Sequence, residues 1–510
     1  MKNINFIKNS SGQKIKRLTA FGVLSVVCCL LSVVSLPSCT KDFLEIKPQG
    51  QLTLDNFFQN EAQAIQATNA VYASLRTWEI HVFAYLGMTD IPSDDADKGS
   101  TPTDANFLLD MDNLTLDATN IAPLTVYQGY YRAIFRTNVA IAGIATVPTM
   151  NETLRARLIA ECKVMRAYYY FNLVRWFGDL PIITKSLAPN EYSQPRAPKA
   201  DVYKLIVQDL KDAISALPEK NGYGASDVGR VTKGTASGLL AKVYLTQGDF
   251  TNAETYANQV INSNQYALYP DYDKIFTLDG ENSSESIFEV QCIATATGDG
   301  GSQYNEVQGV RGVPNLGWGF NRPSDSFIAE FEPDDPRRTA TILYEGDILP
   351  DGSAIIQHNA EVFGARYNKK AWVPQHPGGN GDGPGNIRLL RYADVVLMAA
   401  EAQNENGKTA EALKNLNAVR KRARGSLPET VLPVITETDK TKLRNLIWHE
   451  RRCELGMEQQ RWFDLARTGR LAEALKKNGK PFVVGKHELF PIPQQEIDLS
   501  AGALAQNPGW

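Results

Sequence analysis

The chain has 510 residues, of which 43% are hydrophobic and 22% charged, so it is long enough to bury the core of one large domain or of several ordinary ones. Its 53 basic and 57 acidic residues give a formal net charge of −4. A slightly acidic chain argues against nucleic-acid binding, which uses clustered excess positive charge.

The first 38 residues have the pattern of a secretory signal. Five basic residues come first, and an apolar stretch then runs from Leu18 to Leu36. The segment contains no acidic residue. A transmembrane anchor would need about 20 apolar residues, and here Ser25, Ser32 and Ser35 interrupt the run. Removal of residues 1–38 would leave 48 basic against 57 acidic residues, a charge of −9.

The end of this segment predicts a lipid anchor. Leu36-Pro37-Ser38-Cys39 resembles a bacterial lipobox, in which the cysteine thiol is acylated and becomes the first residue. Each buried CH₂ of an acyl chain stabilises membrane association by about 0.8 kcal/mol, and stable anchoring takes roughly two chains. We therefore expect residues 39–510 to be held on a membrane through Cys39.

The remaining cysteines predict no disulfide framework. Cys162, Cys292 and Cys453 are odd in number and lack metal-ligand spacing. Cys162 and Cys453 lie in helical patterns, where a buried packing thiol is expected.

Most periodic signals along the chain are helical. Apolar residues recur at three- and four-residue steps, which predicts helices over residues 61–76, 152–177, 201–216, 233–247, 251–263, 391–405, 409–424, 440–456 and 470–477. Residues 77–120 carry no such pattern and are expected to be irregular.

Two of the predicted helix pairs share a template. Gly248 and Gly407 each follow an alanine by seven residues and precede small or apolar residues at matching offsets. Glycine permits the tight turn between two closely packed antiparallel helices. The pattern resembles the tetratricopeptide helix hairpin.

Between these pairs lies a long excursion, residues 264–388, rich in Gly, Pro, Asn and Asp. One strand is predicted in it, from Ser286 to Ile293. Irregular segments of this length inside a compact protein are functional or disordered, and the scattered aromatic residues favour order.

Four segments, in order along the chain, resemble the SusD/RagB family of nutrient-binding lipoproteins. They are Cys39-Thr40-Lys41-Asp42-Phe43-Leu44-Glu45; the helix from Ala160 to Phe171 with its exit Gly178-Asp179-Leu180-Pro181; Glu450-Arg451-Arg452-Cys453-Glu454-Leu455 with Arg461-Trp462-Phe463-Asp464-Leu465; and Phe490-Pro491-Ile492-Pro493 with Gln506-Asn507-Pro508-Gly509-Trp510.

The resemblance implies a mostly α fold in which tetratricopeptide-like helix pairs form a scaffold and long loops form the binding face. Residues 39–510 would be one unit, with scaffold at about 56–263 and 389–478 and a ligand-side excursion at about 264–388. It also implies a lipid-anchored protein of the outer membrane, facing the cell surface, that works beside a SusC-like TonB-dependent transporter.

Binding residues were sought among aromatics outside the predicted helices, because a sugar ring is gripped by an aromatic plane and by polar groups that reach its hydroxyls. Of the seven tryptophans, Trp176, Trp448 and Trp462 lie in helical motifs and are expected in the core. The candidate ligand contacts, each of which could instead pack a loop onto the scaffold, are Trp78, Tyr85, Asp94, Tyr304, Trp318, Asn321 and Trp372.

Metal binding and catalysis have less support in the sequence. Asp94, Asp95 and Asp97 could hold a structural Ca²⁺ but lack EF-hand spacing, so no cofactor is predicted. His449 is expected to be a structural hydrogen-bonding residue, and Arg451 and Arg452 to bridge helices to acidic partners. No nucleophile elbow, metal motif or catalytic triad pattern occurs, so no catalytic residues are predicted.

The sequence thus favours a non-catalytic surface lipoprotein that captures oligosaccharides or polysaccharides and passes them to a transporter. Capture of peptides by the same fold is an alternative, because peptide binders use main-chain donors and acceptors in a groove. A surface glycan hydrolase is a third hypothesis, which would need two suitably spaced carboxylates.

Overall fold

The computed structural model describes residues 57–510, except residues 296, 363, 365 and 378–379. The predicted signal segment and Cys39 lie outside the described residues. Residues 58–510 form one compact unit. Among the helices that can be described, none combines the length and apolar character needed to cross a bilayer.

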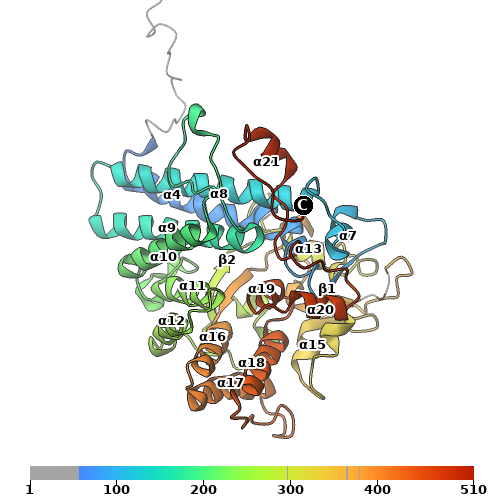
Figure 1. Ribbon diagram of the computed structural model, residues 1–510. Coiled ribbons are helices and arrows are strands. Elements are labelled where there is room, and N and C mark those ends of the chain that lie inside the picture. Colours follow the sequence, from blue (N-terminus) through green and yellow to red (C-terminus); the bar gives the residue numbers. More distant parts are fainter. Residues whose placement is uncertain (1–56, 296, 363, 365, 378–379) are drawn as a thin grey trace, which may run out of the picture. The chain divides into compact units, whose positions relative to one another are not determined.

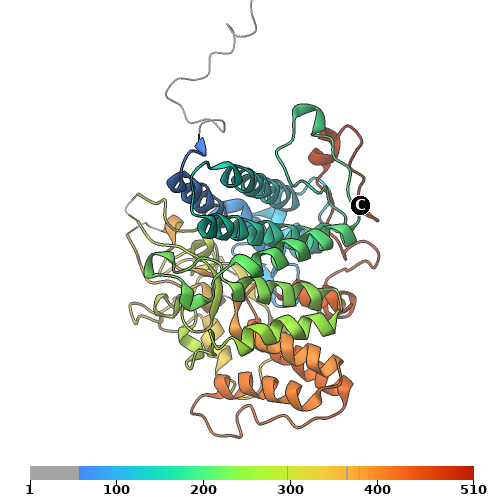
Figure 2. The same cartoon turned by 90° about the vertical axis from the view of Figure 1, so that its left-hand side faces the viewer.

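The scaffold consists of antiparallel helices packed in chain order, each against its neighbour, as Figures 1 and 2 show. This confirms the predicted fold class. The helices are α4 (Glu61–Ala73), α8 (Ile121–Thr146), α9 (Glu152–Phe177), α10 (Lys199–Ala216), α11 (Lys233–Thr246), α12 (Phe250–Asn262), α16 (Tyr392–Glu405), α17 (Thr409–Arg424) and α18 (Lys440–Leu455).

The two helix pairs with the shared template are α11–α12 and α16–α17. Their turn glycines, Gly248 and Gly407, have φ of 74° and 78°, a left-handed conformation that favours glycine. Helix α12 packs on α16, so the pairs lie side by side although the excursion separates them in sequence (Figure 2). Leu397, Leu416 and Ile447 meet in a buried cluster that joins α16, α17 and α18.

Helix α8 was not predicted, although it has 26 residues. Its buried residues recur at three- and four-residue steps, but apolar side chains also lie on the other side, including Ile121 and Phe135, which are half-exposed, and these mask the buried stripe in the sequence. Gly129 lies inside the helix because α5 (Trp78–His81) packs against it, where an added Cβ would lie 2.3 Å from the Glu79 Cβ. Tertiary packing therefore specifies this helix more than its periodicity does.

The excursion is more regular than its composition suggested. Its strands take part in three two-stranded antiparallel pairs. Strand β3 (Phe320–Pro323) pairs with β1 (Ala96–Gly99) of the earlier loop region, β2 (Ser286–Val290) with β6 (Ile387–Arg391), and β4 (Ile342–Tyr344) with β5 (Arg366–Asn368). The predicted strand from Ser286 is confirmed and ends at Val290. Short helices also occur, in the excursion and in residues 77–120: α6 (Phe83–Gly87), α7 (Asn106–Asp112), α13 (Tyr304–Gln308), α14 (Asp325–Ile328) and α15 (Arg337–Thr341). After α18, the chain adds α19 (Arg461–Arg467), α20 (Leu471–Lys477) and α21 (Gln494–Leu499).

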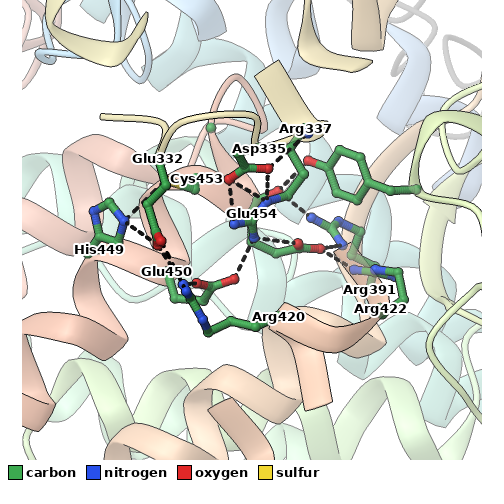
Figure 3. A network of polar contacts seen from close by, with 12 residues as sticks. Glu332, Asp335, Arg337, Arg391, Arg420, Arg422, His449, Glu450, Cys453 and Glu454 are labelled. Carbon is green, nitrogen blue, oxygen red and sulfur yellow. Dashed lines mark hydrogen bonds and ion pairs between the residues drawn. The ribbon is translucent and has the colours of Figure 1, made fainter. Parts of the chain in front are cut away.

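A buried network of ion pairs joins the excursion to the scaffold (Figure 3). Glu450 and Glu454 of α18 lie at its centre. The first accepts from Arg337 of α15 at 2.5 Å and from Arg420 of α17 at 2.9 Å; the second accepts from Arg391, at the end of β6, at 2.7 Å. The network therefore fixes the excursion against α17 and α18.

The predicted roles of three further residues on α18 are confirmed. Arg451 pairs with Asp394 of α16 at 2.9 Å, and Arg452 pairs with Asp95 at 2.7 Å. His449 lies 2.8 Å from Glu330 through Nδ1. The free thiols Cys162 and Cys453 are buried, as expected from their helical positions.

Candidate functional site

Two of the predicted aromatic residues, Trp78 and Trp318, lie together although they are far apart in the sequence. Their ring centroids are 6.1 Å apart at an interplanar angle of 59°. Phe83 of α6 packs on both rings, at centroid distances of 5.4 and 5.8 Å. Both tryptophans are only partly buried, so the fold does not fully enclose either residue.

The loop that carries Trp318 is held by backbone hydrogen bonds. The Trp318 N–H donates to the Glu306 carbonyl of α13 at 2.8 Å, and the Gly319 N–H donates to the Gly309 carbonyl at 2.9 Å. Only glycine fits at position 317, because a Cβ there would lie 2.1 Å from the Glu306 carbonyl oxygen. Gly317 therefore lets the loop press against α13, and the indole packs on Trp78 and Phe83.

Beside Trp78 is a cavity of about 290 Å³, which we call the tryptophan cavity. Its wall combines the Trp78 ring with polar side chains from three segments, including Arg76, Asp299, Gln303 and Asp382. It opens next to the Trp78–Trp318 pair, so an apolar plane and several hydrogen-bonding groups converge on one place.

The polar groups of the tryptophan cavity are positioned by the loop before α13. The buried Asp382 carboxylate accepts hydrogen bonds from the N–H groups of Thr295, at 3.1 Å, and of Gly301. Arg76 donates to the Gly300 carbonyl of the same loop. Hydrogen bonds from the hydroxyls of Thr297 and Thr295 lower the pKa of Asp299, so this carboxylate is ionised at neutral pH.

Four of the predicted contact residues are buried and have internal partners. Tyr85 packs edge-on to Trp176 with centroids 5.9 Å apart, and Tyr304 donates through its hydroxyl to Gln459 at 3.2 Å. Asn321 donates to Gln308 at 2.8 Å, and Asp94 pairs with Arg461 at 2.7 Å. The structure thus assigns these four side chains internal contacts and no exposed face.

The acidic run around Asp94 is similarly occupied. Asp95 pairs with Arg452 and Asp97 pairs with Arg322, at 2.7 and 2.6 Å. Each of the three carboxylates that could have bound Ca²⁺ therefore has an arginine as its partner.

Trp372 lies apart from the tryptophan cavity. It packs on the apolar cluster formed by Val310, Leu343 and Tyr367, beside a small pocket of about 20 Å³ that it shares with His376. Its indole nitrogen has no hydrogen-bond partner in the described part of the chain. It does not line the tryptophan cavity, although its pocket shares Glu306 and Gly309 with the contacts that hold the Trp318 loop. Of the three helical tryptophans, Trp176 and Trp462 are fully buried and Trp448 is partly buried.

Sequence reasoning missed Arg76, Asp299, Gln303 and Asp382 as members of the site. Arg76 is the last residue of the predicted helix, two residues before Trp78. This position in the sequence could have identified it as a member of the site. The other three lie in polar, glycine-rich loops that resemble any solvated loop. The resulting site suits a ligand that has a flat apolar face and a rim of hydroxyl groups.

Comparison with known proteins gives matches over nearly the whole chain. The profile of the SusD family matches residues 284–510. The profile described as "Starch-binding associating with outer membrane" matches residues 42–245. "SusD-like protein P2" of Formosa agariphila is 28% identical over 515 residues, covering 94% of this chain and 98% of that protein.

Solved structures agree with this assignment. A structure named "Laminarin binding SusD-like protein" is 32% identical, with a TM-score of 0.73, and the match covers 89% of this chain and all of that one. "Surface glycan-binding protein A from Bacteroides thetaiotaomicron in complex with laminarihexaose" is 26% identical with the same TM-score, covering 88% and 99%. The sequence, the fold and these matches together show that the chain belongs to the SusD/RagB family.

Proposed function

We propose that this protein is a non-catalytic, surface-exposed lipoprotein that captures glycan chains at the Trp78–Trp318 pair. The observation that carries the proposal is the meeting of these two indoles beside the polar tryptophan cavity. The faces of sugar rings carry polarised C–H groups that pack on aromatic planes, while their hydroxyls need planar donors and acceptors. Arg76, Asp299 and Gln303 supply such groups next to Trp78.

The named ligands of similar proteins support a glycan. Two of the matching structures carry laminarin or laminarihexaose in their names, and one matching profile carries starch. We infer that the ligand here is an oligosaccharide or polysaccharide, and β-glucans are the first class to test.

We propose binding without catalysis because of the state of the carboxylates. A glycosidase needs a carboxylic acid with a raised pKa to protonate the leaving group. In the tryptophan cavity, the pKa of Asp299 is lowered, and Asp382 accepts backbone hydrogen bonds that its loop needs. Reducing-end release from a bound glycan would contradict this part of the proposal.

The anchor and the transport step are proposed on the sequence pattern and on family membership. Acylation of Cys39 would hold the protein on the outer membrane, where it would deliver its ligand to a SusC-like TonB-dependent transporter. Intact-mass analysis of native protein should show fatty acids on a chain that begins at Cys39. Purification from outer membranes in mild detergent should recover the transporter with it.

Isothermal titration calorimetry against a polysaccharide panel that includes laminarin tests the binding site. We expect Trp78→Ala and Trp318→Ala each to weaken binding by about tenfold or more, about 1.4 kcal/mol, because each removes part of the aromatic surface. Tyr192→Ala is the matched control, since Tyr192 is a strongly exposed aromatic that does not line the tryptophan cavity. Full affinity in both tryptophan variants would refute the site.

A further inference from the structure

A second cavity, of about 310 Å³, adjoins the tryptophan cavity. We call it the α4 cavity. Ala73 and Arg76 line both cavities, so the two adjoin at these residues, and we call the pair together the trough. Small-ligand sites usually have volumes of about 300–1,000 Å³, and each cavity alone is at the lower end of that range.

One face of a helix forms the floor of the trough. Tyr72, Ala73 and Arg76 lie three, four and seven residues after Asn69, on one face that runs from α4 into the short helix Ser74–Arg76. At 1.5 Å per residue, Asn69 and Arg76 are about 10 Å apart along the helix axis. The floor is therefore longer than one sugar ring and ends next to Trp78.

The opposite wall is the loop before α11, pressed against Gln291, which directly follows β2 in the excursion. Gly229, with φ of 91°, lies so close to Gln291 that a Cβ would be 2.4 Å from the Gln291 side-chain carbon. This contact fixes the loop. It also leaves Val228 56% exposed at the cavity, where it supplies apolar surface opposite Tyr72.

Polar groups of the α4 cavity are fixed in position but have hydrogen-bonding capacity to spare. The Asn69 side-chain oxygen accepts from Arg230 at 2.9 Å, and Arg230 is itself held by Asp227 and Glu161 at 2.6 and 2.9 Å. Throughout the described ranges, neither the Asn69 amide nitrogen nor the Ser226 hydroxyl makes a hydrogen bond. Arg76, where the cavities meet, has no ion pair with any described carboxylate.

We propose that the α4 cavity is a second subsite for the same glycan chain, so that affinity depends on the length of the oligosaccharide. This rests on the proposed function. The chain lies on Trp78 and Trp318 at one end, passes Arg76, and reaches Asn69, Ser226 and Val228 at the other. Short oligosaccharides fill only the tryptophan cavity, whereas longer ones gain contacts along α4.

Calorimetry of the full-length protein with laminarin oligosaccharides of increasing length tests the subsite. Wild-type affinity should rise with length and then level off. Asn69→Ala should remove part of the rise, about fivefold for long ligands, because one hydrogen-bond donor is lost. Ser226→Trp should fill the cavity and reduce the affinity for long ligands to that for short ones, while binding of the shortest ligand stays unchanged.

The control is Gln66→Ala, an exposed position on α4 that does not line the cavity and should leave the whole length profile unchanged. An equal loss at all lengths in the Asn69 and Ser226 variants, or no loss at any length, would overturn the second subsite. Failure of the proposed function would instead appear in the Trp78 and Trp318 variants, which should weaken ligands of every length.

Discussion

Asp90 is a buried carboxyl that contacts β3, the strand that follows Trp318. One oxygen accepts from Asn321 at 3.2 Å and from Gln459 at 2.8 Å, while the other has no partner among the residues that can be described. Burial disfavours the charged form and raises the pKa of Asp90 to about 7. The group is therefore largely protonated in mildly acidic solution.

This raised pKa predicts that Asp90 makes the free energy of unfolding depend on pH. The folded-state pKa of Asp90 lies above the unfolded value of 3.8, so its favourable contribution is complete below 3.8 and is lost as the pH rises towards 7. Between pH 5 and pH 7 the loss is about 2 kcal/mol. Asp90→Asn keeps the shape without the charge, so its stability relative to wild type should increase by that amount over this range.

Urea unfolding of both proteins at several pH values measures the effect. Glu79→Gln, which changes a partly exposed carboxylate at the surface pair with Arg132, should show a pH dependence close to that of wild type. A constant difference between Asp90→Asn and wild type across pH would show that Asp90 is ionised throughout.

Residue types in loops predicted part of the candidate site, and packing explains why the other predicted residues lie outside it. Trp78 was identified because it follows the end of a predicted helix, and Trp318 because it lies between two glycines. Asp94, Tyr304 and Asn321 came from the same loops but are buried, because β1 and β3 pair and bring those loops into the interior. A sequence shows that a residue lies in a loop, but whether the loop is packed depends on partners far along the chain.

At the scale of elements, helices with one apolar stripe were predicted to within a few residues. Helices α9 and α17 have the predicted bounds, and the others differ by one or two residues at an end, except that α4 ends three residues early in a 3-10 turn. Helix α8 and strand β6 were missed for different reasons. Every residue of β6 is buried, which removes the alternation that a half-buried strand shows, whereas exposed apolar residues such as Phe135 mask the buried stripe of α8.

The turn between α16 and α17 gives a prediction for an element. Gly407 has φ of 78°, and an added Cβ would meet nothing within 4 Å. Gly407→Ala should therefore cost only the left-handed backbone strain, about 1–2 kcal/mol. Gly407→Asn should cost less, because asparagine tolerates this conformation. Denaturant midpoints compare the two, and equal losses would mean that strain is not the cause.

At the scale of the whole unit, buried ion pairs join the excursion to the scaffold. Arg391, at the end of β6, contacts Glu285 of the loop before β2, Glu454 of α18 and Glu458 beyond it, at 2.6–2.7 Å. The Lys370 ammonium also reaches Glu458, at 2.7 Å. Since Trp318 and the loop of Asp382 belong to this excursion, the network sets the position of one half of the proposed glycan site relative to Arg76 and Trp78, which form the other half.

Removing the centre of that network should destabilise the protein far more than removing a surface pair. Arg391→Met keeps the apolar volume but leaves buried carboxylates without their cation, which costs about 3–5 kcal/mol. Arg132→Met breaks the exposed pair with Glu79, in which the arginine is 56% exposed, and should cost less than about 1 kcal/mol. Urea midpoints of the two variants test the contrast.

If Arg391→Met unfolds at the wild-type midpoint, the excursion is held by its apolar clusters, and the ion pairs only select its register. If the expected loss occurs, laminarin affinity measured well below the midpoint should also fall, because a loosened excursion no longer presents Trp318 to Trp78.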